Sequence, residues 1–129
     1  MHRSQVGAYQ EVHITTADPA NLVLQLYAGA ARFLRQAQRA LEGGDGAGFA
    51  TSLSRAHAII AQLSDTLDRD VGGEVVENLD RLYEFMLRHL TDGLIARNPL
   101  HLGQVLACLE MLHEGFQAAL DARANGAAS

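Results

Sequence analysis

The apolar residues of this 129-residue chain recur every three or four positions over four long stretches, the spacing of amphipathic helices. The first stretch opens at Asp18-Pro19, a capping residue followed by proline at the first helical position, and ends at the glycine-rich residues 43–46. The second, which Asp45 can cap, has an inward stripe with coiled-coil-like spacing, formed by Phe49, Leu53, Ala56, Ile60, Leu63 and Leu67.

The third stretch follows the break at Gly72-Gly73 and runs to about Ala96, and Pro99 opens the fourth. The inward stripe of the fourth stretch is Leu102, Val105, Leu109, Leu112, Phe116 and Leu120. Short connections between helices about 30 Å long make sequential helices antiparallel. We therefore predict an all-α, antiparallel up-down four-helix bundle over residues 18–122, with a flexible, extended N-terminal tail over 1–17 and a disordered C-terminal tail over 123–129.

The third stretch is apolar over much more of its circumference than a bundle helix needs. At about 100° per residue its apolar positions cover roughly 200°, where a stripe of about 100° suffices. These positions are Val75, Val76, Leu79, Leu82, Tyr83, Phe85, Met86, Leu87 and Leu90. Two interpretations are open: a deep core with some exposed apolar surface, or a groove that receives another helix from a partner or from the chain's own N-terminus.

Composition narrows the function class. The net charge is −5, and all ten basic residues are Arg and are not clustered, so the basic surface of a nucleic-acid binder is missing. The single cysteine, Cys108, cannot form an internal disulfide and fits a reducing compartment. Because no secretory h-region and no run of about 20 apolar residues occurs, we expect a soluble, intracellular protein with no membrane insertion.

The sequence offers little evidence for a catalytic or metal-binding site. Glu110 and His113 form half of a carboxylate-bridged di-metal motif, but the interiors of the first two helices contain no Glu to complete it. No Ser/His/Asp or Cys/His arrangement and no strand-borne phosphate loop can be argued. We therefore predict no enzyme activity, no metal and no cofactor. Two alternatives stay open: a histidine phosphotransfer bundle using His57, although Ala-Ile-Ile-Ala follows it instead of a Lys-Gly pair, or a helical homodimeric interaction module.

Three stretches carry a resemblance to a known family. They are Ala8-Tyr9 followed by Pro19 and "LVLQLYAG"; the long segment "SLSRAHAIIAQLSDTLDRDVGGEVVENLDRLYEFMLRHL"; and "ARN" before the last helix, with an aromatic residue near the end of that helix. In order and spacing they resemble the flagellin export chaperones, the FliS family. The chain departs from the family pattern at Ala28, Phe85, Pro99 and Phe116, changes that mostly keep the apolar character.

The resemblance implies a cytoplasmic chaperone that binds the disordered C-terminal segment of flagellin, prevents premature polymerisation and aids delivery to the flagellar type III export apparatus. The export gate would then recognise the loaded chaperone, and the free protein would be a monomer or a weak homodimer. By the same correspondence Val6 and Tyr9 would cover an apolar pocket in the free state. The other expected partner-binding residues are Leu22, Leu26, Tyr27, Ile60, Leu79, Leu82, Tyr83 and Met86.

Overall fold

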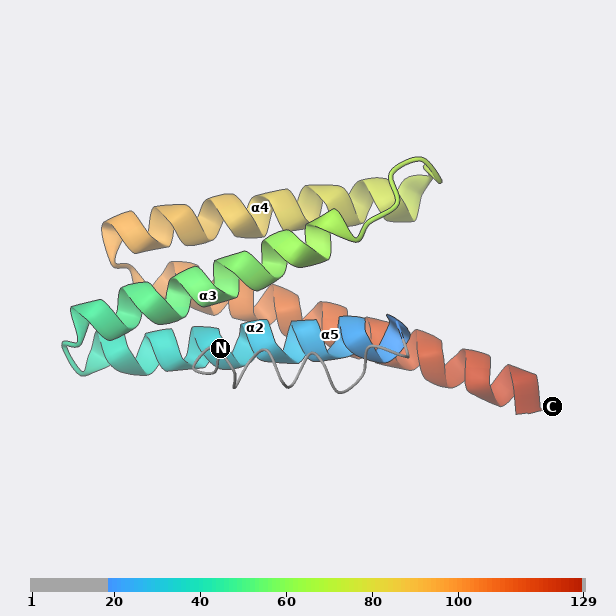
Figure 1. Ribbon diagram of the computed structural model, residues 1–129, viewed down its shortest axis with the longest axis horizontal. Coiled ribbons are helices and arrows are strands. Elements are labelled where there is room, and N and C mark those ends of the chain that lie inside the picture. The colour runs from blue at the N-terminus through green and yellow to red at the C-terminus, as the bar shows by residue number, and fades with distance from the viewer. Residues whose placement is uncertain (1–18, 129) are drawn as a thin grey trace, which may run out of the picture.

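The computed structural model describes residues 19–128, all of which lie in four helices and their short connections. Helix α2 spans Pro19–Glu42, α3 Gly46–Asp65, α4 Glu74–Ala96 and α5 Pro99–Ala128. Each helix packs against its neighbours in sequence, and α5 returns to pack against α2, so the four enclose one core (Figure 1). The predicted all-α, up-down four-helix bundle is confirmed, while the tail predicted over residues 1–17 lies outside the described part of the chain.

The turn between α2 and α3 is built as the sequence predicts. Asp45 caps α3, because its Oδ1 accepts a hydrogen bond of 2.9 Å from the backbone N–H of Gly48. A Cβ at position 48 would lie 2.2 Å from Asp45 Oδ2, so a side chain there would force the capping carboxylate to turn. Gly44, with φ of +77°, supplies the left-handed residue that reverses the chain.

The turn between α4 and α5 brings those two helices close together. Arg97 is left-handed at φ 52°, and the Asn98 side chain accepts a hydrogen bond of 2.9 Å from the Leu100 N–H at the start of α5. Near this turn, a Cβ at Gly93 would lie only 2.9 Å from the Cβ of His101. Glycine at position 93 therefore permits the close approach of α4 to α5.

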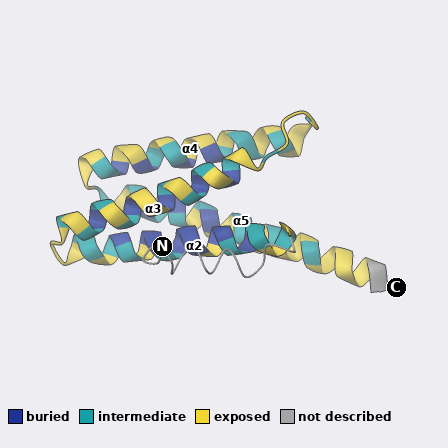
Figure 2. Cartoon of the chain, viewed as in Figure 1, coloured by how far each residue is buried: buried dark blue, intermediate teal, exposed yellow. Residues whose placement is uncertain are grey.

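The core does not fill all four helices evenly (Figure 2). In α4 the buried side chains begin at Tyr83, and in α5 they end at Leu109. Each of these two helices therefore contributes to the core only through the half that lies next to their shared turn. The predicted stripe of α3 is buried from Phe49 to Leu63. In α5 only the first half of the predicted stripe is buried, and the partly buried second half is Leu112, Phe116 and Leu120.

Helix α5 is longer than the sequence analysis predicted. It was expected to end near residue 122, with disorder beyond, whereas the helix continues to Ala128 and projects past the rest of the bundle (Figure 1). The alanine-rich sequence after Leu120 has high helix propensity, and the costs of Asn125 and Gly126 fall in the last turns.

Candidate functional site

An open apolar groove of about 360 Å³ lies at the end of the bundle opposite the α4–α5 turn. All four helices and the α3–α4 connection contribute to it, because the antiparallel arrangement brings the start of α2 and α4, the end of α3 and the second half of α5 together. Its lining residues are Val23, Tyr27, Leu63, Thr66, Leu67, Asp68, Leu79, Tyr83, Met111, Leu112, Gly115, Phe116 and Ala119.

The groove exists because the helices supply too little side-chain volume at this end to close it. The first nine residues of α4, from Glu74 to Leu82, include no buried side chain. On the facing part of α5, Gly115 has no side chain, and a Cβ placed there would meet nothing within 4 Å. Glycine in a helix interior costs about 1 kcal/mol relative to alanine, so α5 loses stability at a position where space is left open.

Two tyrosines from opposite corners of the bundle meet where the groove joins the core. Helices α2 and α4 do not pack against each other directly, yet the hydroxyls of Tyr27 and Tyr83 lie 2.6 Å apart in a hydrogen bond. Each residue is only 3% exposed. Burial raises the pKa of both phenols above the ordinary value, although the bond to Tyr83 partly offsets the rise in the pKa of Tyr27, so both are neutral at physiological pH.

Further rings extend this pair along the groove. Phe116 on α5 packs edge-on against Tyr27 with ring centroids 6.4 Å apart, and His113, one turn earlier, lies 6.5 Å from the same ring. Phe116 is partly buried and packs against the core. Aromatic side chains present large apolar area at a small cost in side-chain entropy, so this wall is suited to contact with another apolar segment.

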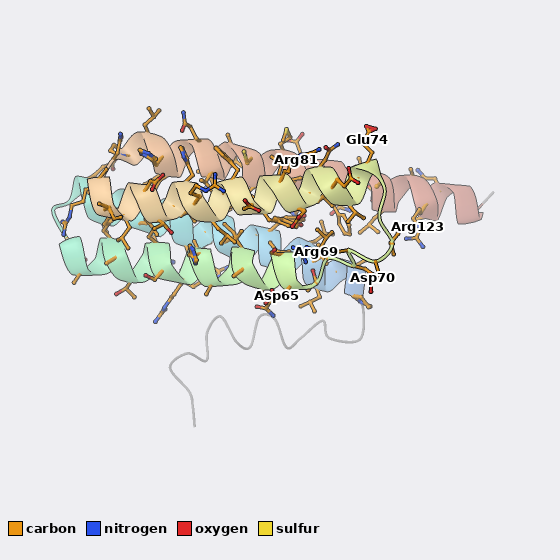
Figure 3. All side chains as sticks on the ribbon, turned by 90° about the horizontal axis from the view of Figure 1, so that it is seen from above. Asp65, Arg69, Asp70, Glu74, Arg81 and Arg123 are labelled. Atoms are coloured by element: carbon orange, nitrogen blue, oxygen red, sulfur yellow. The ribbon has the colours of Figure 1, made fainter. Side chains whose placement is uncertain are left out.

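Arg69 fixes the α3–α4 connection against the start of α4. Its guanidinium donates to the Asp80 carboxylate at 2.6 and 3.1 Å, and to the carbonyl and hydroxyl of Ser64 at 3.2 and 3.0 Å. Figure 3 shows Arg69 and Asp70 at this connection, at the same end of the bundle as the groove. Because residues 66–68 form part of the groove wall, these bonds position that wall more than they stabilise the fold.

A second aromatic group lies outside the groove, between α4 and α5. The Phe85 and His89 rings are stacked with centroids 4.8 Å apart, and His101 lies 4.4 Å from His89. His89 Nε2 is hydrogen-bonded to Gln104, while the buried Nδ1 of His101 has no partner among the described residues. Phe85 remains exposed, as do Val75 and Ile95 on the same helix, so part of the apolar surplus of α4 faces solvent.

The sequence-predicted partner-binding residues that the structure describes fall into three groups. Those that line the groove are Tyr27, Leu79 and Tyr83. Those buried in the core and absent from the groove lining are Leu26, Ile60 and Met86. Those half-buried outside the groove are Leu22 and Leu82, and Val6 and Tyr9 lie outside the described residues.

None of the sequence-predicted partner-binding residues lies on α5, although that helix supplies a large part of the groove lining. Met111, Gly115, Phe116 and Ala119 all contribute. Phe116 was assigned to the inward stripe of a helix assumed to be packed along its full length. The signal available in the sequence was a glycine next to Phe116 inside a helical stretch, at position 115.

The side chains considered for catalysis or metal binding either lie outside the groove or make structural contacts. Glu110 forms an ion pair of 2.7 Å with Arg35 on α2, and burial raises the pKa of the Cys108 thiol. Within residues 19–128 no three His, Cys, Asp or Glu side chains are grouped so that they could hold a metal ion. In the same range, no helix has the length and apolar character needed to cross a bilayer.

The sequence was compared with known proteins. Residues 2–123 match the family described as Flagellar protein FliS. The chain is 34% identical to the flagellar secretion chaperone FliS of Bacillus subtilis over 98 residues, which cover 76% of this chain and 72% of the relative. It is 32% identical to FliS of Vibrio cholerae, over 88% of this chain and 87% of the relative, and 32% identical to FliSB of Pseudomonas aeruginosa, over 82% and 84%.

Proposed function

The chain belongs to the FliS family of flagellar proteins, and we propose on that premise that it is a flagellar secretion chaperone whose client is flagellin. In this proposal it binds the C-terminal segment of flagellin in the cytosol, prevents premature polymerisation and aids delivery to the flagellar type III export apparatus. The observation that supports a client site is the open apolar groove, which all four helices line and whose lining includes the exposed polar residues Thr66 and Asp68.

The groove has the properties that such a client requires. A disordered segment gains structure when its amphipathic helical turns bury their apolar side against a matching surface. Burying on the order of 1,000 Å² of apolar area at ~25 cal/mol/Å² gives roughly 25 kcal/mol before the costs of ordering and association, which consume most of it. A groove formed in advance by four packed helices adds little ordering cost on the chaperone side.

The N-terminal residues have a place in the same proposal. We assign Val6 and Tyr9 as apolar residues that cover the groove in the free protein and are displaced by flagellin. A cover of this kind would lower the apparent affinity for the client, because its displacement has a free-energy cost. It would also reduce the exposed apolar surface of the chaperone before it meets a client.

The test is size-exclusion chromatography with calorimetry on the chain and the flagellin of its own organism. We expect a one-to-one complex with full-length flagellin and none with flagellin that lacks its C-terminal segment. A variant lacking residues 1–17 is expected to bind full-length flagellin more tightly than the parent, because no cover has to be displaced. Failure of the parent chain to bind full-length flagellin would overturn the proposed function.

The alternatives give different results in the same experiment. A helical homodimeric module would elute as a dimer both before and after addition of flagellin, whereas a client groove is occupied only when the client is present. A phosphotransfer bundle would be labelled by a phosphodonor at His57, which is half-buried on α3, and a His57→Ala variant would stay unlabelled.

A further inference from the structure

We propose that the Tyr27–Tyr83 hydroxyl pair is a polar anchor for the client: it donates one hydrogen bond to a neutral carbonyl acceptor that the bound segment presents among its apolar residues. The acceptor would be a side-chain amide of Asn or Gln, or a main-chain carbonyl left unpaired at a helix end. This inference rests on the proposed function and adds a polar requirement to a groove whose other contacts are mainly apolar.

The two hydroxyls carry one more proton than their mutual hydrogen bond uses. Each phenol carries one proton, and the hydrogen bond between Tyr27 and Tyr83 uses one of the two. Among the described residues, neither hydroxyl has a second hydrogen-bond partner. One O–H in the pair therefore has no acceptor in the described structure, at a site where both residues are 3% exposed.

The groove is where an acceptor can reach that O–H. Both tyrosines line it, and elsewhere they belong to a core cluster of apolar side chains. The other groove hydroxyl, on Thr66, already donates to the Leu63 carbonyl at 2.7 Å, and the Asp68 carboxylate at the rim accepts from the Asp70 N–H. Neither is bonded to the tyrosine pair, so the pair is the groove's unused donor.

The chemistry of the site favours a neutral acceptor. Burial raises the pKa of both phenols, so the pair stays protonated and remains a donor. A carboxylate brought to the same depth would lose its hydration in exchange for one hydrogen bond from a neutral group, which is unfavourable. An amide or main-chain carbonyl has a smaller desolvation cost and is satisfied by one good donor.

The double variant Tyr27→Phe/Tyr83→Phe tests the proposal. It removes both hydroxyls and keeps both rings, and removing both partners of a buried hydrogen bond is nearly neutral for stability. We expect it to melt within a few degrees of the parent and to bind full-length flagellin on the order of tenfold more weakly, because the client carbonyl is buried without a donor. Thr91→Val is the matched control, since it removes an α4 hydroxyl outside the groove, and it should bind like the parent.

The client side provides a second readout. Each Asn and Gln in the flagellin C-terminal segment is changed to Leu, and the affinities for the parent and for the double variant are compared. One substitution should weaken binding to the parent but not to the double variant, which would identify the acceptor by its coupling energy. If no Asn or Gln shows coupling while the double variant still binds weakly, the acceptor is a main-chain carbonyl.

The failures of the two proposals can be told apart. If the parent does not bind flagellin, the proposed function is wrong. If the parent binds flagellin and the double variant binds as tightly or more tightly, the groove accepts a wholly apolar segment and the anchor is wrong while the function stands.

Discussion

At the scale of single residues, the Tyr27–Tyr83 pair is the most informative feature of this bundle. Two phenols from helices whose backbones do not pack against each other share a hydrogen bond of 2.6 Å at the junction of core and groove. Their rings add apolar area to the core, and their hydroxyls join opposite corners of the bundle. A buried polar pair of this kind is stable only when both members are present, because one alone leaves an unsatisfied group.

The pair predicts how stability depends on alkaline pH. Because burial raises both phenol pKa values above the unfolded value near 10, their contribution to stability is complete below pH 10 and is lost as the pH rises above it. Each tyrosine that ionises only on unfolding lowers the free energy of unfolding by about 1.4 kcal/mol per pH unit. The chain has no Lys, so few other groups titrate in this range.

Urea unfolding between pH 9 and pH 11.5 would measure this effect. The parent should lose stability steeply above pH 10, and the double Phe variant should lose much less. Cys108, whose pKa is also raised by burial, acts in the same direction in both proteins and cancels in the comparison. Equal slopes for the two proteins would show that the phenols ionise as easily in the folded state as in the unfolded state.

At the scale of helices, the sequence predicted which elements form but not how they align along their axes. Helical periodicity identified the buried stripe of α3 from Phe49 to Leu63, and the surplus apolar face of α4 was visible in the sequence. Periodicity gives the direction of a side chain around a helix, not its height relative to a residue on another helix. The meeting of Tyr27 with Tyr83, and of Phe116 with both the groove and Tyr27, depends on that height.

Two glycines of α5 allow a test of the groove that keeps the helix constant. Gly103 and Gly115 both lie inside α5, and a Cβ at either would meet nothing within 4 Å, but only Gly115 lines the groove. Leucine is a better helix former than glycine by roughly 0.8 kcal/mol, so both Gly103→Leu and Gly115→Leu should raise the free energy of unfolding by several tenths of a kcal/mol or more. Only Gly115→Leu should weaken flagellin binding, because its side chain occupies space in the groove.

Calorimetry with full-length flagellin and thermal melts of both variants provide the measurement. A Gly115→Leu variant that is more stable than the parent and binds less well separates the groove from the fold. If both variants bind like the parent, the client does not use the part of the groove beside α5.

At the scale of the whole molecule, the bundle has a closed end and an open end. Near the α4–α5 turn the helices approach so closely that only glycine fits at position 93, and their buried residues lie in this half. At the other end α4 has no buried residue before Tyr83 and α5 has none after Leu109, so both continue as helices with little core of their own. Core packing therefore decreases from the closed end to the open end, and we call this decrease the packing gradient. The surplus apolar face of α4 is in part a consequence of it, because Leu79 lines the groove and Val75 is exposed.

The packing gradient predicts that local stability differs between the two ends of the bundle, which amide hydrogen exchange can measure. Local opening requires less free energy where few apolar contacts must be broken, so residues 74–82 of α4 and residues 110–126 of α5 should exchange faster than residues 49–63 of α3. Full-length flagellin should slow exchange at this open end, since a bound segment adds the missing contacts, and should change the closed end little. Flagellin without its C-terminal segment serves as the control and should leave the pattern unaltered. Uniform protection along α4 and α5 in the free protein would contradict the gradient, because it would mean that the open end is held as firmly as the core.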